Sequence, residues 1–301
     1  NAPIRLKNNK LSKAFEMLTK MYGMPDYGEF DPTPLLAPFY ALFFGMCVGD
    51  AGYGLLLVLL GLYLKKKVSK SMAGLMNLLI TLGVATTIVG AVFNTFFGAS
   101  ITDLDLPEWM NSLIISGKWD GLAYDKTMVI ALLVGMFHIC FAMGVKAVCE
   151  TVRYGFKNSL SAWAWLLLIG GSVTVATLNY LGVIDMEMSK MAFIGIGCVS
   201  AIGIYLLNNL RRNVFVNIGA GLWDTYNMAT GILGDLLSYL RLYALGLAGG
   251  MLGGVFNSLG MQLRDAVGDF LFGIPGWICF GLIFVAGHSL NIALSCLSGY
   301  V

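Results

Sequence analysis

Seven long apolar segments determine most of what this chain can fold into. Each holds roughly 20 or more largely apolar residues, the length that an α-helix needs to cross the hydrocarbon core of a bilayer, about 30 Å thick. They cover residues 35–64, 74–98, 127–149, 162–182, 191–209, 231–262 and 273–301. Only 12% of all residues are charged, whereas about 25% are charged in soluble domains. We therefore predict an all-α polytopic membrane protein.

The first apolar segment predicts two short helices. It is interrupted by the sequence Gly49-Asp-Ala-Gly-Tyr-Gly54, where we expect an N-terminal helical hairpin to bend and return. With this hairpin, fourteen of the nineteen Lys and Arg residues fall on the cytoplasmic side, and nine of the seventeen Asp and Glu residues fall on the other. Cytoplasmic loops carry an excess of Lys and Arg. The pattern thus favours about eight transmembrane helices in a cell membrane, with both ends cytoplasmic.

The segments also predict how the chain is organised. Residues 1–33 are polar and basic and read as a cytoplasmic lead-in to a transmembrane domain over 34–301. Residues 213–229 mix apolar and polar side chains, which predicts an interfacial or re-entrant amphipathic helix before the helix over 231–262. That helix would be about 48 Å long at 1.5 Å per residue, so it must tilt or protrude. We expect two long tilted helices at the C-terminal end.

Arg241 is the only basic residue between Ile232 and Phe256. An arginine stays charged in a protein, and a charge near a bilayer centre costs at least about 2.5–3.5 kcal/mol. At about 100° per residue, its face of the helix carries Leu245 and Leu252, with Ser238 at the edge. Such a smooth apolar face with one fixed cation suits a surface past which carboxylates move, because the cation favours their ionised form.

A structural role for Arg241 is the alternative, through an internal salt bridge to Asp50, Asp235 or Glu150. Small residues lie roughly opposite the arginine on the same helix and suit close packing on a neighbouring helix. These are Gly246, Gly250 and Gly253. Packing on that side leaves the Arg241 face free, which favours the functional role.

Two further sets of polar residues are candidates for lining ion paths. His288, Asn291, Ser295 and Ser298 share one face of the last helix, where they either line an aqueous path or hydrogen-bond to other helices. Near the cytoplasmic end of the Arg241 helix, a second path is predicted to involve Asp224, Asn227 and Asp235, although Asp224 could instead be a solvated acid at the membrane interface. Ser238 is a further candidate for lining a half-channel. Asp50 is expected to stabilise the hairpin bend rather than bind an ion.

No catalytic motif is present in the sequence. It has no Walker loop or catalytic triad, and its two histidines and six cysteines show no metal-ligand spacing. The net charge of +2 gives no sign of nucleic-acid binding. We expect no cofactor, no metal and no bond chemistry.

Four segments, in order along the chain, resemble the membrane half of subunit I, also called subunit a, of V-type and A-type rotary ATPases. They are Asp31-Pro-Thr-Pro34, Phe44-Gly-Met-Cys-Val-Gly-Asp-Ala-Gly-Tyr-Gly54, Gly234-Asp-Leu-Leu-Ser-Tyr-Leu-Arg-Leu-Tyr-Ala-Leu-Gly-Leu-Ala248 and Gly287-His-Ser-Leu-Asn-Ile-Ala-Leu-Ser295. The resemblance implies a stator subunit that forms two ion half-channels and couples ATP hydrolysis or synthesis to H⁺ or Na⁺ flow. Arg241 would face the carboxylates of a rotating proteolipid ring.

The same resemblance implies partners and two departures. The partners would be the ring, the peripheral stalk subunits, the membrane subunit linked to the central stalk, and the lipid bilayer. The family's large cytoplasmic N-terminal domain is absent from this chain, and its second arginine would fall just beyond Val301. Eukaryotic relatives have a glutamate near Ser295 and a histidine where Gly249 stands. The alternative function is a secondary transporter with a broken-helix site, which would need a second copy of the Gly-rich break.

Overall fold

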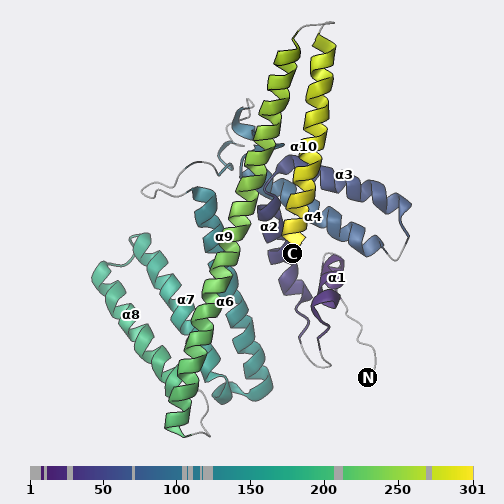
Figure 1. Ribbon diagram of the computed structural model, residues 1–301. Coiled ribbons are helices and arrows are strands. Elements are labelled where there is room, and N and C mark those ends of the chain that lie inside the picture. The colour runs from purple at the N-terminus through teal and green to yellow at the C-terminus, as the bar shows by residue number, and fades with distance from the viewer. Residues whose placement is uncertain are drawn as a thin grey trace. The chain divides into compact units, whose positions relative to one another are not determined.

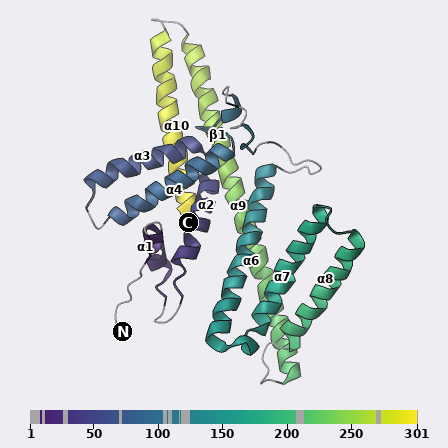
Figure 2. The ribbon, with the colours of Figure 1, turned by 180° about the vertical axis from the view of Figure 1, so that it is seen from behind.

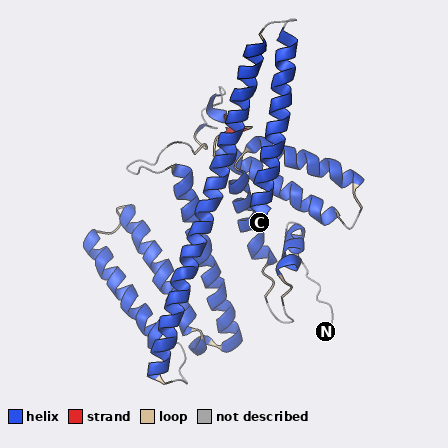
Figure 3. Ribbon diagram, viewed as in Figure 1, coloured by secondary structure: helices blue, strands red, loops and turns tan. Residues whose placement is uncertain are grey.

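The computed structural model describes residues 8, 9, 12–25, 30–69, 72–103, 107, 111–115, 117, 125–206, 213–268 and 273–300. Figure 1 and Figure 3 show this part of the chain as almost entirely helical. Six of its helices are long and apolar enough to cross a membrane. They are α4 (Ala73–Val92), α6 (Lys126–Tyr154), α7 (Leu160–Tyr180), α8 (Met186–Ala201) with the π-helix η3 (Ile202–Leu206), α9 (Val214–Val267) and α10 (Ile274–Tyr300). The predicted all-α polytopic fold is confirmed.

The count of about eight helices is too high by this criterion. The segment 35–64 forms α2 (Thr33–Val48), of 16 residues, and α3 (Ala51–Lys67), of 17 residues. At 1.5 Å per residue these helices are about 24 and 26 Å long, shorter than the roughly 30 Å hydrocarbon core.

The chain folds into two compact units. The first comprises residues 1–131 and 239–301, and the second comprises residues 132–238.

The first unit breaks between α2 and α3 at the predicted Gly-rich sequence. Gly49 ends α2 with φ 59°, a left-handed conformation that glycine adopts readily. The expected pairing of α2 with α3 is wrong, because α3 packs mainly against α4; both views show these two helices side by side (Figure 1, Figure 2). Glycines allow the approach: a methyl group at Gly83 would lie 2.9 Å from the amide nitrogen of Val58.

A small β-hairpin follows α4 in the same unit, where the sequence predicted only the end of an apolar segment. Strands β1 (Thr95–Phe96) and β2 (Ala99–Ser100) are antiparallel. Phe97 and Gly98 connect them with φ 48° and 72°, as in the two-residue type I′ turn that suits twisted strands. The short 3₁₀ helix η1 (Ile101–Asp103) comes next.

Helix α1 (Ser12–Tyr22) packs its apolar face on α2 and α4. Phe15 meets Tyr40 edge to face, with ring centroids 6.2 Å apart, and the Thr19 hydroxyl lies 2.8 Å from that of Thr33. Before α2, Asp31 accepts hydrogen bonds from the amide and hydroxyl of Thr33. Burial raises the pKa of Asp31, but these bonds and one from Asn8 outweigh it and lower the pKa. The lead-in is therefore folded onto the helices where it is described.

The second unit contains most of α6, the 3₁₀ helix η2 (Phe156–Asn158), α7, α8 with η3, and the first half of α9. Its core is formed by Ala164, Trp165 and Ile204. The expectation of a separate amphipathic helix over 213–229 is wrong, since α9 runs without a break for 54 residues. No proline lies between residues 213 and 267, so a change from mixed to apolar composition does not interrupt the backbone hydrogen bonds.

Candidate functional site

Arg241 lies in the part of α9 that belongs to the first unit, and its side chain is exposed. The residues that share its face by helical spacing are apolar and open: Leu252 is 41% exposed and Val255 is 53% exposed. Ala248 is also exposed, whereas Leu245 is half-buried. The arginine is therefore presented on an unfilled apolar surface of its unit.

The opposite side of α9 is packed, as the glycine stripe predicted. A methyl group at Gly253 would lie 2.9 Å from the Cα atom of Gly98, and one at Gly250 would lie 3.7 Å from the Thr95 side chain. Gly246 lies against the carbonyl oxygen of Met46 at the end of α2. The partners of the stripe are thus the β-hairpin and the end of α2 rather than the flank of one helix.

Two of the three expected alternative partners of Arg241, Asp50 and Glu150, have other contacts. Asp50 is 1% exposed and accepts four backbone hydrogen bonds, described below. Glu150 lies 3.9 Å from the Lys146 ammonium within the second unit. Among the described residues of the first unit, Arg241 forms no ion pair with a carboxylate. A fixed charge without an internal counter-charge in its own unit is available to an external one.

Asp50 joins the helix break to the β-hairpin. Its Oδ1 accepts from the amides of Gly52 (2.8 Å), Tyr53 (3.2 Å) and Phe97 (2.9 Å), and its Oδ2 accepts from the Gly98 amide (2.8 Å). The first two are the contacts of a helix N-cap. The other two connect Asp50 to residues that lie 47 and 48 positions further along the chain. The expectation that Asp50 stabilises the bend is confirmed, and its role extends to the hairpin turn.

The predicted stripe on α10 faces inward. His288, Asn291 and Ser295 are 4%, 2% and 7% exposed, and Ser298 is half-buried. The Asn291 amide donates to the Tyr53 hydroxyl (2.8 Å) and to the Gly249 carbonyl oxygen (2.7 Å). The structure therefore has His288 and Asn291 in hydrogen bonds with other elements, which was one of the two readings of this stripe.

The direction of these hydrogen bonds follows from their two ends. The Asn257 amide donates to the Phe97 carbonyl oxygen (2.7 Å), so its Oδ1 accepts from His288 Nε2 (3.1 Å). His288 Nδ1 is then left as an acceptor for the Tyr53 hydroxyl (2.7 Å). This pattern of donors and acceptors matches the Nε2–H tautomer of His288.

The remaining candidates lie on α9 within the second unit. Asp224, Asn227, Asp235 and Ser238 are separated by three, eight and three residues, which puts them on one face of the helix. Asn227 and Asp235 are exposed, and Asp224 and Ser238 are half-buried.

Sequence reasoning missed Tyr53 and Asn257. Tyr53 is fully buried and lies inside the Gly-rich break, while Asn257 follows the apolar run of the Arg241 helix. Tyr53 is buried and Asn257 is half-buried, and a polar side chain shielded from water needs a hydrogen-bond partner, so each residue was a signal in itself. Their partners lie as far as 238 residues away, however, and no spacing rule reaches that far. No cluster of three metal-ligating side chains occurs in the described part of the chain.

The fold and the position of Arg241 define a polytopic membrane protein with one fixed charge on an exposed apolar face. Residues 1–117 match the V-type ATPase 116kDa subunit family. The A-type ATP synthase subunit I of Methanocaldococcus jannaschii is 30% identical over 324 residues, which cover 99% of this chain and 45% of the relative. That of Pyrococcus horikoshii is 29% identical, with 100% and 44% covered, and the V-type ATP synthase subunit I of Chlamydia pneumoniae is 25% identical, with 99% and 51% covered.

The chain is therefore similar to the V-type ATPase 116kDa subunit family over residues 1–117, and to the subunit I proteins of A-type and V-type ATP synthases over nearly its whole length. It spans about half the length of the relatives it matches.

Proposed function

We propose that this chain is the stator subunit of a rotary ATPase and forms two ion half-channels against a rotating proteolipid ring. The single observation that supports this most is the position of Arg241, which is exposed on an apolar face and has no carboxylate partner among the described residues of its unit. The subunit itself would be non-catalytic. It would couple ATP hydrolysis or synthesis elsewhere in the complex to H⁺ or Na⁺ movement.

The chemistry of the arginine is electrostatic. Two unit charges 4 Å apart interact by about 4 kcal/mol at an effective dielectric constant of 20, which favours the ionised form of a passing carboxylate by roughly a thousandfold. A ring carboxylate that arrives opposite Arg241 therefore releases its ion. The same positive charge repels cations that would otherwise leak between the half-channels.

The two polar sets would serve the two half-channels. His288, Asn291 and Ser295 would contribute to the non-cytoplasmic path. His288 and Asn291 are supported by a connected hydrogen-bond network with Tyr53 and Asn257, and Ser295 by its buried position on the same face of α10. Asp224, Asn227, Asp235 and Ser238 would line the cytoplasmic path, and their support is a shared face of α9. The sets lie on opposite sides of Arg241 along the sequence, as two offset paths require.

The partners follow from the same proposal. The ring would meet the exposed face around Arg241, and the peripheral stalk subunits and the central-stalk-linked membrane subunit would complete the assembly in a cell membrane. The alternative, a secondary transporter that binds substrate at the Gly-rich break, is disfavoured. Asp50, the one charge at that break, already accepts four backbone hydrogen bonds.

The test is ion pumping by the reconstituted complex that carries Arg241→Ala or Arg241→Lys. We expect Arg241→Ala to abolish pumping while the ring still co-purifies, and Arg241→Lys to retain a reduced rate, because it keeps the charge but not the planar guanidinium. Arg264→Ala is the matched control, since Arg264 lies on the same helix but binds Asp265 at 2.6 Å. Normal pumping by Arg241→Ala would contradict the proposal. Loss of the ring from the purified complex would instead indicate a structural role.

A further inference from the structure

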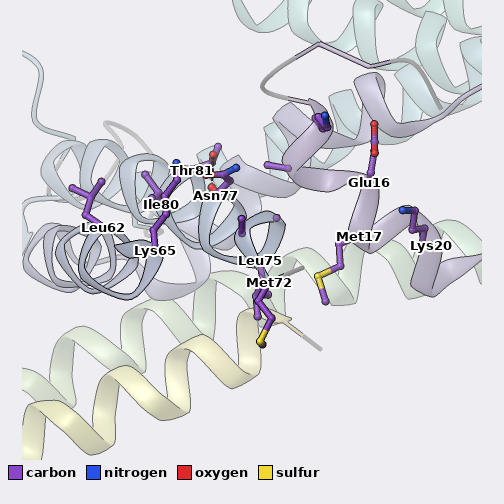
Figure 4. A pocket seen from close by; sticks show the side chains of 14 residues that line it. Glu16, Met17, Lys20, Leu62, Lys65, Met72, Leu75, Asn77, Ile80 and Thr81 are labelled. Carbon is purple, nitrogen blue, oxygen red and sulfur yellow. Dashed lines mark hydrogen bonds between the residues drawn. The ribbon is translucent and has the colours of Figure 1, made fainter. Parts of the chain in front are cut away.

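A cleft between α1 and the α3–α4 hairpin takes no part in the function proposed above. Its volume is about 940 Å³, which lies within the roughly 300–1,000 Å³ typical of ligand sites. Figure 4 shows that α1 supplies Glu16, Met17 and Lys20 on one side, whereas α3 and α4 supply the other. All of its lining residues belong to the first unit.

The charge around the cleft is mainly positive. Lys13, Lys20 and Lys65 line it, and Glu16 is the only acidic residue among its lining side chains. All three lysines are exposed, and none forms an ion pair with a carboxylate in the part of the chain that the structure describes. This excess of positive charge favours an anionic ligand.

The N-terminus of α4 adds to the positive potential of the lysines. Met72, Ala73, Gly74 and Leu75 also line the cleft, and the N-cap residue Met72 provides no side-chain cap. The amide groups of a first helical turn and the helix dipole attract anions. Space is available there, because a methyl group at Gly74 would meet no heavy atom within 4 Å.

The other half of the cleft is apolar. Leu62 and Ile80 line it, and Leu62 continues a row of exposed side chains along one face of α3. Leu55, Leu59 and Leu62 are 46%, 55% and 47% exposed, and one turn further on the row ends at Lys65. An apolar row that ends in a lysine is typical of a helix whose charged end lies at the membrane surface.

We propose that the cleft binds an anionic phospholipid. The headgroup phosphate would lie among Lys13, Lys20 and Lys65, and an acyl chain would follow the Leu55–Leu62 face of α3. This apolar row favours a lipid over a soluble anion or an acidic protein segment, because neither of those would cover exposed leucines that adjoin a bilayer.

The test is native mass spectrometry of the full-length subunit in mild detergent, with phosphatidylglycerol and phosphatidylcholine added in turn. We expect wild-type protein to retain phosphatidylglycerol preferentially. The variant Lys13→Gln/Lys20→Gln/Lys65→Gln should lose that preference by at least about fivefold, the effect of roughly one lysine at a membrane surface. The corresponding Lys→Arg triple variant should keep it, because it keeps the charge.

A matched control removes the same charge elsewhere, through Lys146→Gln/Lys157→Gln/Lys190→Gln, and should bind lipid like the wild type. Equal retention of phosphatidylglycerol by the cleft variant would overturn the proposal. So would displacement of the lipid by inorganic phosphate, which would indicate a soluble-anion site. Absence of any lipid preference in the full-length wild type would show that another segment covers the cleft, and would overturn it too.

Discussion

Replacing Asp50 with asparagine tests how the helix break and the hairpin are held together. The Oδ1 atom of asparagine can keep the three hydrogen bonds from Gly52, Tyr53 and Phe97, but the amide nitrogen that replaces Oδ2 is a donor facing the Gly98 amide. A buried donor without a partner costs about 1–3 kcal/mol. The three remaining bonds also lose their charged acceptor, at roughly 0.5 kcal/mol or more each.

Part of this loss is offset, because the substitution also removes the desolvation penalty of a buried charge. We therefore expect Asp50→Asn to lower the free energy of unfolding by about 3 kcal/mol, at the lower end of the sum. For a folding unit of 150–250 residues, the size range of the first unit, that is roughly 6–12 °C in melting temperature. The assay is the fraction of purified protein that remains monodisperse in detergent after heating.

The control is Asp103→Asn, which removes an exposed acid from η1 nearby and should leave the melting temperature unchanged. A second readout separates local from global effects: hydrogen exchange of the hairpin amides should accelerate in Asp50→Asn. If the melting temperature and the exchange rate both match the wild type, the four hydrogen bonds do not hold the hairpin and the reasoning fails.

Two further predictions concern the packed side of α9 and α10. Tyr53→Phe removes the hydroxyl donor to His288 Nδ1 and should lower stability by about 1–3 kcal/mol; heat denaturation checks this, and an unchanged melting temperature would contradict the network. Gly253→Ala places a methyl group 2.9 Å from the Gly98 Cα atom and should cost about 1–3 kcal/mol. Gly234→Ala on the same helix meets nothing within 4 Å and should be neutral or stabilising, so equal effects of the two changes would rule out the close approach.

The parts of the fold that the sequence predicted are those governed by local physics. Apolar segments of sufficient length predicted the long helices, and the Gly49–Gly54 sequence predicted the position of the α2–α3 break. The glycine stripe on α9 gave its packed side. Each of these features depends on residues within a few helical turns, where spacing alone determines which side chains share a face.

The parts that the sequence did not predict depend on distant residues. Residues 35–64 alone do not indicate that α3 packs on α4 rather than on α2, because that choice also depends on Gly83 of α4, which lies close to Val58 of α3. The continuity of α9 was missed for another reason. The polar residues of 213–229 were taken to mark a separate helix, although a backbone without proline stays helical through such a change in composition.

The turn at Phe97 and Gly98 explains why Arg241 points outward. Three contacts converge on it: Asp50 accepts from both of its amides, Asn257 donates to the Phe97 carbonyl oxygen, and Gly253 packs on Gly98. Two of these three come from α9, so they fix the rotation of that helix about its axis.

A shift of α9 by one residue position would rotate it by about 100°. It would also move Asn257 away from the Phe97 carbonyl oxygen, and a shift in one direction would bring Leu252 to the place where Gly253 packs on the turn. The exposure of Arg241 is therefore set by the residues on the opposite side of its helix rather than by contacts of its own. Substitutions at those residues should consequently change the orientation of the Arg241 side chain, although they do not contact it. Their effect therefore reports on the position of the arginine and not on its charge.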